Sequence, residues 1–381
     1  MTPPTRLGPD LAALERALGG LARLFTGAGY EAVSPPHLFP ADLMLDLYGE
    51  DIRARAFLFP GGGGDEVCLR PDFTVPVVLA HGERGWGRPA RYAYQGPVFR
   101  RQAAGSSRPV EYLQAGVENL GAADPAAAEA EVLDLTLRGL GLLGVGAHRV
   151  TTGDLGIVFG LLDALEMPAG RRARLRRHLW RPARFHALVA GAVAGAPAPT
   201  PRRAALIAAV AAPDPLARIE RLAAAEGEII GLREIEDIAE RAAALAEAAA
   251  EPPMPAAQAD LIEAALAVTG PAEQALARLR DLTAAAGVDL GPQLDAFARR
   301  LDAMAARGLD GATLAFDADF GRNLEYYDGF VFEITGPDPA LPLAGGGRYD
   351  SMTARLGAGR AIPAIGAMIR PEAALAAAGG A

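Results

Sequence analysis

The chain contains 381 residues, of which 51% are hydrophobic, and it carries a formal net charge of −9 at pH 7 with a pI near 5.2. This length suffices for one large domain and a smaller one. No apolar run reaches the ~18–20 residues that a membrane span needs, and the N-terminus lacks the basic start and apolar core of a secretory signal. We therefore expect a cytoplasmic protein with no membrane partner, and the acidic balance argues against a general nucleic-acid binder.

Several kinds of site are excluded by the reactive residues that the chain lacks. Cys68 is the only cysteine, which excludes an internal disulfide and a cysteine-based metal cluster. The basic residues are all arginine, so there is no lysine for a Schiff base or for a phosphate-binding loop that ends in Gly-Lys-Ser/Thr. The histidines show no paired metal spacing: they are His37, His81, His148, His178 and His186. We expect neither a metal nor a cofactor.

The first 158 residues alternate between predicted helices and short strands. Leucines at helical spacing predict an amphipathic helix over 9–29, which Gly27 and Gly29 end. Apolar residues on both sides of GGGG at 61–64 predict a hairpin over 57–74. The remaining patterns predict strands over 89–101 and 108–121, joined by a polar loop at 102–108, then a helix over 123–143 and a strand over 148–158.

Residues 157–305 are rich in alanine, leucine and arginine and read as a series of helices, with proline-rich breaks at 197–201 and 251–255. Strands resume at 312–321 and 326–336, and 362–369 predicts a strand that runs into a helix. The pattern predicts an α+β fold with a largely antiparallel sheet flanked by helices. We expect a core made of 1–156 and 306–381, with 157–305 as a helical insertion.

Polar residues in the predicted strands are of the kinds that bind a free amino acid. An α-ammonium needs carboxylates or amide oxygens, and a carboxylate needs an arginine. Because strand residues two or four apart share a face, Asp72 would lie beside Thr74, and Gln114 beside Glu118. Arg100 and Arg322 would supply positive charge. Spacing alone favours the plainer interpretation, in which these are ordinary solvated strand residues.

A resemblance to a known family favours the amino-acid site over the interpretation as ordinary strand residues. LRPDFT resembles LRPEGT, GPVFRRQ followed by LQAGVE resembles motif 2, and GRNLEYYDGFVFE resembles the RGLDYYxGxVFE segment of class II aminoacyl-tRNA synthetases of the histidyl type. GGGRYD and PAIGAMI resemble the approach to motif 3, and GYEAVSPPHLFP stands where the dimer-forming motif 1 belongs. The motifs occur in the family's order over nearly the whole chain. The resemblance implies the class II antiparallel sheet and a homodimer.

Carried over residue by residue, the resemblance implies a histidine pocket with most of its contacts kept. Asp72 replaces a glutamate of the family, and Phe73 replaces a glycine, which would narrow the pocket. The implied histidine-binding residues are Asp72, Phe73, Thr74, Arg100, Gln114, Glu118, Arg322, Tyr326 and Tyr327.

The nucleotide side of the implied site is altered. Gln102 stands where motif 2 has a glutamate, Val110 where the following loop has an arginine, and Ala373 where motif 3 has its arginine. Arg370 precedes that position by one helical turn, but Pro371 is expected to start the helix there and argues against a substitution by Arg370. Because preorganised positive groups stabilise the charge that develops in ATP activation, we expect no catalytic residues.

The resemblance implies a function because the histidine contacts are kept while the nucleotide contacts are changed. Only eleven residues follow Arg370, so we expect no anticodon-binding domain and no tRNA partner. The synthetase-like family that fits is the regulatory subunits of ATP phosphoribosyltransferase, which act with the short-form catalytic subunit in the first step of histidine biosynthesis. This implies a homodimer within a hetero-oligomer, with L-histidine as a ligand either in the old pocket or at a subunit interface.

Two alternatives remain open from the sequence. The first is a truncated histidyl-tRNA synthetase-like ligase that still forms an aminoacyl adenylate. The second is a synthetase-derived RNA-binding module, for which the basic run 171–186 with Trp180 and Phe185 is the candidate surface. The plainer interpretation of that run is a solvated, arginine-rich helix.

Overall fold

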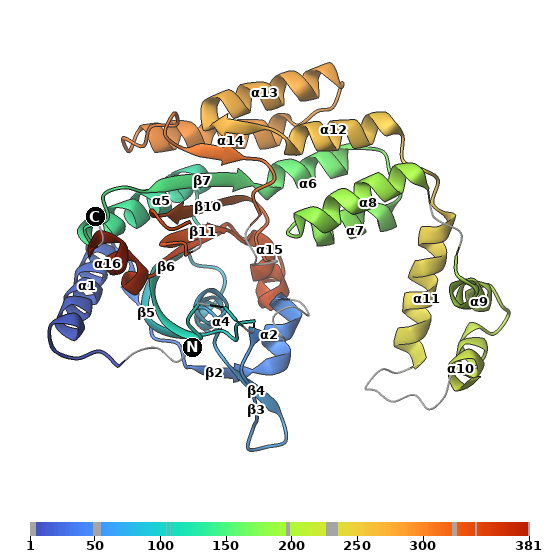
Figure 1. The fold of residues 1–381 in the computed structure, drawn as a ribbon, viewed down its shortest axis with the longest axis horizontal. Coiled ribbons are helices and arrows are strands. Elements are labelled where there is room, and N and C mark those ends of the chain that lie inside the picture. Colours follow the sequence, from blue (N-terminus) through green and yellow to red (C-terminus); the bar gives the residue numbers. More distant parts are fainter. Residues whose placement is uncertain are drawn as a thin grey trace. The chain divides into compact units, whose positions relative to one another are not determined.

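The computed structural model describes residues 5–48, 55–103, 105–106, 108–195, 199–225, 235–321, 326–339 and 341–379. The chain divides into two compact units, one made of Met1–Val158 with Leu266–Ala381 and the other of Phe159–Ala265. Figure 1 traces both units in chain order. Among the described residues, every helix is too short or too polar to span a bilayer.

A mixed sheet forms the centre of the first unit. In the described part of the chain it has nine strands in the order β1-β5-β6-β12-β11-β10-β7-β9-β8. Only the pairs β1–β5 and β7–β9 are parallel, and the other neighbours are antiparallel, as predicted. The strands are β1 (Glu31–Ala32), β5 (Ala90–Phe99), β6 (Glu111–Leu120), β7 (Arg149–Asp154), β8 (Thr269–Pro271), β9 (Ala315–Asp317), β10 (Phe330–Thr335), β11 (Ala344–Arg348) and β12 (Ala364–Ile369).

A smaller sheet of three strands in the order β2-β4-β3 contains the predicted hairpin. Its strands are β2 (Leu38–Pro40), β3 (Leu58–Pro60) and β4 (Glu66–Leu69), and β3 pairs antiparallel with β4. The glycines 61–64 form the turn between them, where Gly64 has a φ of +93° that favours glycine.

Two helices, α1 (Gly8–Gly27) and α5 (Pro125–Leu142), pack together and against the central strands. The start of α5 follows from its sequence, because the Asp124 side chain accepts a hydrogen bond from the Ala127 N–H at 3.1 Å and Pro125 occupies the first turn. A further helix, α14 (Gly291–Ala305), packs against α5. The remaining helices of this unit are α2 (Ala41–Tyr48), α4 (Thr74–Arg84), α13 (Ala272–Ala285), α15 (Asp350–Thr353), the π-helical η1 (Ala354–Ala358) and α16 (Pro371–Gly379).

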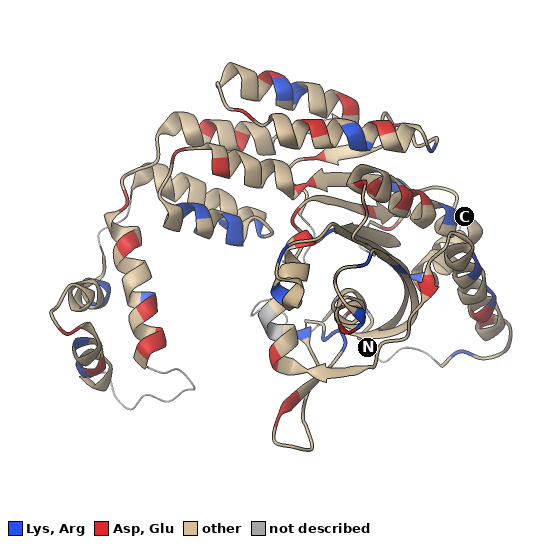
Figure 2. Cartoon of the chain, turned by 180° about the vertical axis from the view of Figure 1, so that it is seen from behind, with Lys and Arg blue, Asp and Glu red and all other residues tan. Residues whose placement is uncertain are grey.

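The second unit is helical, but it is shorter than the predicted 157–305. Residues 266–305 group with the sheet-containing unit, because β8 pairs with β9 and α14 packs against α5. The helices that the second unit contains or shares at its ends are α6 (Leu155–Ala164), α7 (Ala169–His178), α8 (Pro182–Ala194), α9 (Pro201–Val210), α10 (Pro215–Ala225), α11 (Ile235–Ala250) and α12 (Ala256–Leu266). The arginines gather on α7, whereas α11 carries both arginine and acidic residues (Figure 2).

Candidate ligand site

The pair Gln114 and Glu118 lies on one face of β6, as the strand periodicity predicts. Both side chains are buried, with exposed fractions of 1% and 0%. Glu118 faces Gly366 of the neighbouring strand β12, and a Cβ atom at Gly366 would lie 1.6 Å from Glu118 Oε2. Only glycine at 366 leaves room for this carboxyl group.

The predicted strand face for Asp72 and Thr74 is wrong. Thr74 is the first residue of α4, and Asp72 lies in the bend before it. The alternation of polar and apolar residues in this segment suggests a strand. Pro76, however, is compatible with the first turn of a helix, where its missing N–H costs no intrahelical hydrogen bond. Thr74 still reaches the site, because its hydroxyl donates to Glu118 Oε1 at 2.9 Å.

Glu118 has a second donor that the sequence did not identify. The Tyr349 hydroxyl donates to Glu118 Oε2 at 2.5 Å, and the fully buried Tyr349 comes from the GGGRYD segment. Burial raises the pKa of Glu118 to about 8, with a smaller contribution from the Asp72 carboxylate, while the hydrogen bonds from Tyr349 and Thr74 oppose the shift. This carboxyl group is therefore protonated over much of the range in which an ordinary glutamate is ionised.

Tyr326 and Tyr327, the two tyrosines predicted as histidine contacts, line one cavity together with Asp72 and Thr74. Tyr326 Oη is 3.5 Å from Asp72 Oδ2 and 3.5 Å from Thr74 Oγ1. Its ring centroid lies 4.6 Å from that of Tyr327, and a Cβ atom at Gly347 would lie 2.8 Å from the Tyr327 ring. The predicted ligand Arg322 lies outside the described residues.

These groups surround a small cavity of about 20 Å³. It is lined by Asp72, Thr74, Tyr94, Arg100, Gln114, Tyr326, Tyr327, Gly345, Gly366, Ala367 and Met368. The space corresponds to about one water molecule, so an amino acid could enter only after the pocket widens. Gln114 Oε1 is buried and has no hydrogen-bond partner among the described residues, which leaves an acceptor for a ligand donor.

Phe73 does not line this cavity. Its ring stacks on Tyr94 with centroids 4.4 Å apart and an interplanar angle of 9°, and the Arg70 guanidinium lies 3.9 Å from its centroid. The Phe73 ring packs in the core behind Tyr94, whose own ring forms part of the cavity wall.

A second cavity of about 230 Å³ is lined by Gln102 and Ala373, two of the three positions at which the resemblance predicts an altered nucleotide side. The third, Val110, is not part of its lining; its carbonyl accepts a hydrogen bond from the Arg100 N–H at 2.7 Å. Gln102 Nε2 donates to the Pro109 carbonyl at 3.1 Å. Arg100 lines both cavities.

Arg370 also lines the second cavity, although α16 begins at Pro371 as predicted. The residue lies just before the helix, and its guanidinium is 5.1 Å from the Tyr112 ring centroid. A helix that starts at Pro371 therefore does not exclude Arg370 from this cavity, because the residue before the helix lies in the cavity wall.

Part of the basic run 171–186 forms ion pairs inside the helical unit. Arg171 is buried and pairs with Glu251 at 3.3 Å, and Arg174 pairs with the same carboxylate at 2.5 Å. Arg176 lies 2.7 Å from Asp163. These arginines link helices, and Arg177, Arg181 and Arg184 of the same run are exposed. Among the described residues, no cluster of three or more histidine, cysteine or acidic side chains is arranged to hold a metal ion.

Comparisons with known proteins identify the family of this chain. The family model of histidyl-tRNA synthetase matches residues 5–249 and 237–374. The ATP phosphoribosyltransferase regulatory subunit of Chelativorans sp. is 39% identical over 334 residues, which cover 86% of this chain and 88% of the relative. That of Brucella ovis is 38% identical over 356 residues, which cover 88% of this chain and 90% of the relative. The chain belongs to the ATP phosphoribosyltransferase regulatory subunit family.

Solved structures confirm the predicted class II synthetase-like fold. An ATP phosphoribosyltransferase regulatory subunit/histidyl-tRNA synthetase from Bacillus halodurans aligns with a TM-score of 0.69 at 20% identity, over 99% of this chain and 82% of that one. A histidine–tRNA ligase subunit from Alicyclobacillus acidocaldarius aligns with a TM-score of 0.59 at 24% identity, over 100% of this chain and 97% of that one.

Proposed function

We propose that this chain is the regulatory subunit of an ATP phosphoribosyltransferase and that it acts in the first step of L-histidine biosynthesis. The observation that carries this function is the 38–39% identity to regulatory subunits over 86–88% of the chain. In this role the chain makes a short-form catalytic subunit active and mediates feedback by histidine.

The altered second cavity supports a subunit without catalytic chemistry of its own. Gln102 is a neutral amide held by the Pro109 carbonyl, and the alanine side chain at 373 has no donor for a phosphate. Losing one preorganised donor costs about 10²–10³ in rate in well-studied enzymes. Adenylate formation by this chain would therefore be very slow, and no residue is assigned a catalytic role.

The first cavity supports L-histidine as the regulatory ligand. Asp72 and the free acceptor Gln114 Oε1 suit an α-ammonium group, and Arg100 suits a carboxylate. Because the cavity holds only about one water molecule, histidine would bind a widened form in which Tyr326 or Tyr327 has moved. Such differential binding to two states is what feedback regulation requires.

Assembly is the remaining part of the proposal. β1 is the edge strand of the nine-stranded sheet in the described residues, and it lies in the segment that resembles the dimer-forming motif 1. An edge strand offers backbone groups for pairing with a second copy. We infer a homodimer within a hetero-oligomer with the catalytic subunit.

Co-expression with a short-form catalytic subunit tests the proposed function. The two chains should co-purify, and phosphoribosyl transfer to ATP should require this chain and be inhibited by L-histidine only when it is present. A catalytic subunit that is fully active and histidine-sensitive alone would overturn the proposal. Histidine-dependent pyrophosphate exchange by this chain alone would instead favour the ligase alternative.

A further inference from the structure

A third cavity lies beside β1, the edge strand of the described sheet. It has a volume of about 560 Å³ and shares no lining residue with the two cavities described above. Its walls come from the end of α4, the start of β5, the end of β6 and the first turns of α5. Pockets of ~300–1,000 Å³ hold organic molecules, and the proposed regulatory function leaves this one unused.

His81 of α4 lines this cavity with one ring nitrogen unsatisfied. The residue is 1% exposed, and its ring is held between those of Tyr92 and Trp86, whose centroids lie 5.8 Å and 5.6 Å away. His81 Nδ1 is 3.2 Å from the Tyr92 hydroxyl oxygen, whereas Nε2 has no hydrogen-bond partner among the described residues. A buried polar atom without a protein partner indicates that water or a ligand completes the site.

The protonation of His81 makes Nε2 a donor. Burial, with a smaller contribution from the Arg84 guanidinium, lowers the pKa of His81 and keeps its ring neutral. A neutral imidazole carries one N–H. In the tautomer in which Nδ1 accepts the proton of the Tyr92 hydroxyl, Nε2 carries that hydrogen and needs an acceptor from whatever occupies the cavity.

Arg91 supplies a second unsatisfied donor to the same cavity. Its Nη2 forms an ion pair with Glu131, and its guanidinium lies 4.4 Å from the centroid of the Tyr30 ring. Arg91 Nε is buried and lacks a hydrogen-bond partner in the described part of the chain. Because the arginine side chain donates and never accepts, this position also requires an acceptor.

The charges of the lining leave one arginine without an acidic partner. Arg84 Nη1 contacts both carboxylate oxygens of Glu31 at 2.9 Å, and Arg91 is paired with Glu131. Arg88 is exposed, and no acidic side chain of the described residues forms an ion pair with it. One unpaired positive charge suits a ligand with a single negative charge.

The remaining acid of the lining, Asp124, does not cancel that charge. Its side chain accepts a hydrogen bond from the Ala127 N–H at 3.1 Å, so it offsets the partial positive charge at the N-terminus of α5. The rest of the wall includes small apolar residues, which leave room for the body of an organic molecule: Pro89, Ala90, Ala122, Ala127 and Ala128.

We propose that this cavity binds a small organic molecule through a carboxylate that accepts a hydrogen bond from His81 Nε2. Arg91 Nε is a further donor to the same molecule, and Arg88 balances its charge. A phosphate monoester, with up to two negative charges, exceeds the one unpaired arginine. The inference goes beyond the proposed regulatory function and does not rest on it, so a failure of either one leaves the other standing.

NMR spectra of the histidine rings in the ¹⁵N-labelled full chain test the proposal. The His81 signals, assigned by their loss in His81→Phe, should first show the tautomer with hydrogen on Nε2. Acetate, 4-methylpentanoate and benzoate should then shift the Nε2 signal in a saturable manner. The corresponding primary amides should bind at least about tenfold more weakly, because hydrogen bonds to charged groups are the stronger ones.

Each contrary result in these spectra decides against the proposal. Acetate is small enough to enter regardless of the shape of the cavity, so an Nε2 signal that no carboxylate shifts would leave water as the occupant and overturn it. Hydrogen on Nδ1 in place of Nε2 would remove the donor. Equal responses to carboxylates and amides, or a stronger response to inorganic phosphate than to acetate, would overturn the assignment of the ligand as a carboxylate.

Variants locate the binding site, with the line widths of the benzoate signals as the measure of affinity. Arg88→Ala should weaken binding about two- to fivefold, the scale of an exposed ion pair, and the exposed position should tolerate the change. His81→Phe keeps an aromatic ring and should weaken binding at least about tenfold. Thermal unfolding checks that both variants are folded.

The matched control is Arg299→Ala, which removes an exposed arginine of α14 outside the cavity lining. It should bind benzoate as the wild type does. An equal loss of affinity in Arg88→Ala and Arg299→Ala would show that only the overall charge matters. Unchanged binding in a folded His81→Phe variant would place the carboxylate elsewhere, and either result would contradict the proposed site.

Discussion

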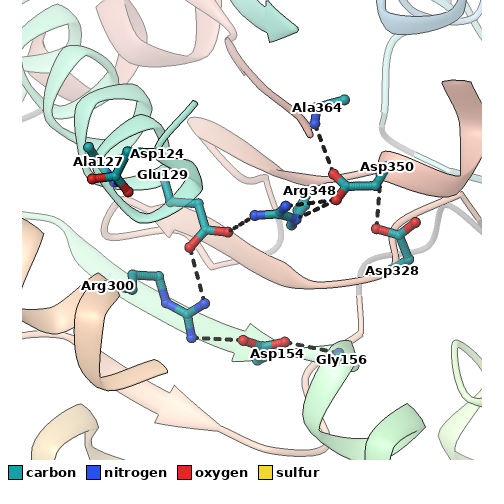
Figure 3. A network of polar contacts seen from close by, with 10 residues as sticks. All are labelled: Asp124, Ala127, Glu129, Asp154, Gly156, Arg300, Asp328, Arg348, Asp350 and Ala364. Carbon is teal, nitrogen blue, oxygen red and sulfur yellow. Dashed lines mark hydrogen bonds and ion pairs between the residues drawn. The ribbon is translucent and has the colours of Figure 1, made fainter. Parts of the chain in front are cut away.

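Arg300 on α14 forms a buried ion pair with Asp154 at the end of β7, with Arg300 Nη2 2.8 Å from Asp154 Oδ2. The same guanidinium donates from Nη1 to Glu129 Oε2 of α5 at 3.3 Å. Glu129 in turn accepts from Arg348 of β11 at 2.9 Å, and Arg348 pairs with Asp350 at 2.7 Å (Figure 3). This network joins three helices, α5, α14 and α15, with two strands, β7 and β11.

The network also supports the ligand pocket. Burial lowers the pKa of Arg348, but the Asp350 and Glu129 carboxylates outweigh that effect, so its pKa is raised and its charge is retained. Arg348 directly precedes Tyr349, which donates to Glu118. Fixing β11 from one face therefore helps to position the tyrosine that projects toward the other face.

Arg300→Ala should destabilise the protein by about 3–5 kcal/mol, because it leaves the buried Asp154 and Glu129 carboxylates without their common partner. Arg280→Ala is the matched control, since Arg280 and Asp295 form an exposed pair that should contribute about 1 kcal/mol or less. Urea unfolding measures the loss of stability in both variants. Similar small losses in the two variants would contradict the importance assigned to the network.

Glu118 should make stability depend on pH. Its pKa is about 8 in the folded protein against a reference value of 4.5. Between these values the folded protein keeps a proton that the unfolded chain has released, so the free energy of unfolding falls as pH rises. The stabilisation that comes from the proton on Glu118 is fully present below pH 4.5 and is lost by about pH 8.

Replacing Glu118 with glutamine removes that titration while keeping the side-chain size. The stability of Glu118→Gln relative to the wild type should increase from pH 5 to pH 8 by at least about 1 kcal/mol, because one pKa unit corresponds to about 1.4 kcal/mol. Denaturant unfolding across this range provides the measurement. Parallel pH profiles for the two proteins would show that Glu118 titrates normally.

Gly366→Ala should disturb the pocket through a steric contact. The added Cβ atom would lie 1.6 Å from Glu118 Oε2, and overpacking of a core costs about 1–3 kcal/mol. Gly62→Ala is the control, because a Cβ atom at Gly62 meets nothing within 4 Å. Thermal unfolding should separate the two variants, and equal melting temperatures would argue against the close approach of Glu118 to β12.

Asp72→Asn should weaken histidine binding about tenfold or more if Asp72 contacts the α-ammonium, since a hydrogen bond to a charged group contributes about 1.5–3 kcal/mol. Asp302→Asn changes an exposed carboxyl of α14 and should leave affinity unchanged. The shift of the unfolding temperature with L-histidine concentration reports the affinity. A wild-type protein that histidine does not stabilise would contradict the pocket as its site.

The strands and their polar residues could be predicted where the local pattern matches the final environment. Gln114 and Glu118 lie four apart on a regular strand, so period-two alternation alone predicts their common face. The same alternation wrongly predicted a shared strand face for Asp72 and Thr74, because Thr74 is the first residue of a helix. Short alternating segments do not distinguish a strand from a bend that enters a helix.

The end of the helical insertion could not be predicted from local sequence. Residues 266–305 are mostly helical, as the pattern indicates. Their grouping with the sheet depends on the β8–β9 pairing and on the contact of α14 with α5. Both contacts join residues far apart in the chain, and helix periodicity carries no information about them.

The sequence by itself determined the order of the motifs, the antiparallel character of the sheet and the replacements at Gln102 and Ala373, because these depend on residue identity and local periodicity. Tertiary structure decided which groups meet. It brought Tyr349 to Glu118 and Arg370 to the cavity of Gln102, because the facing of strands and the path of the chain into a helix are set by packing between distant segments. The pocket's small volume has the same origin, since side-chain packing alone determines how much space remains.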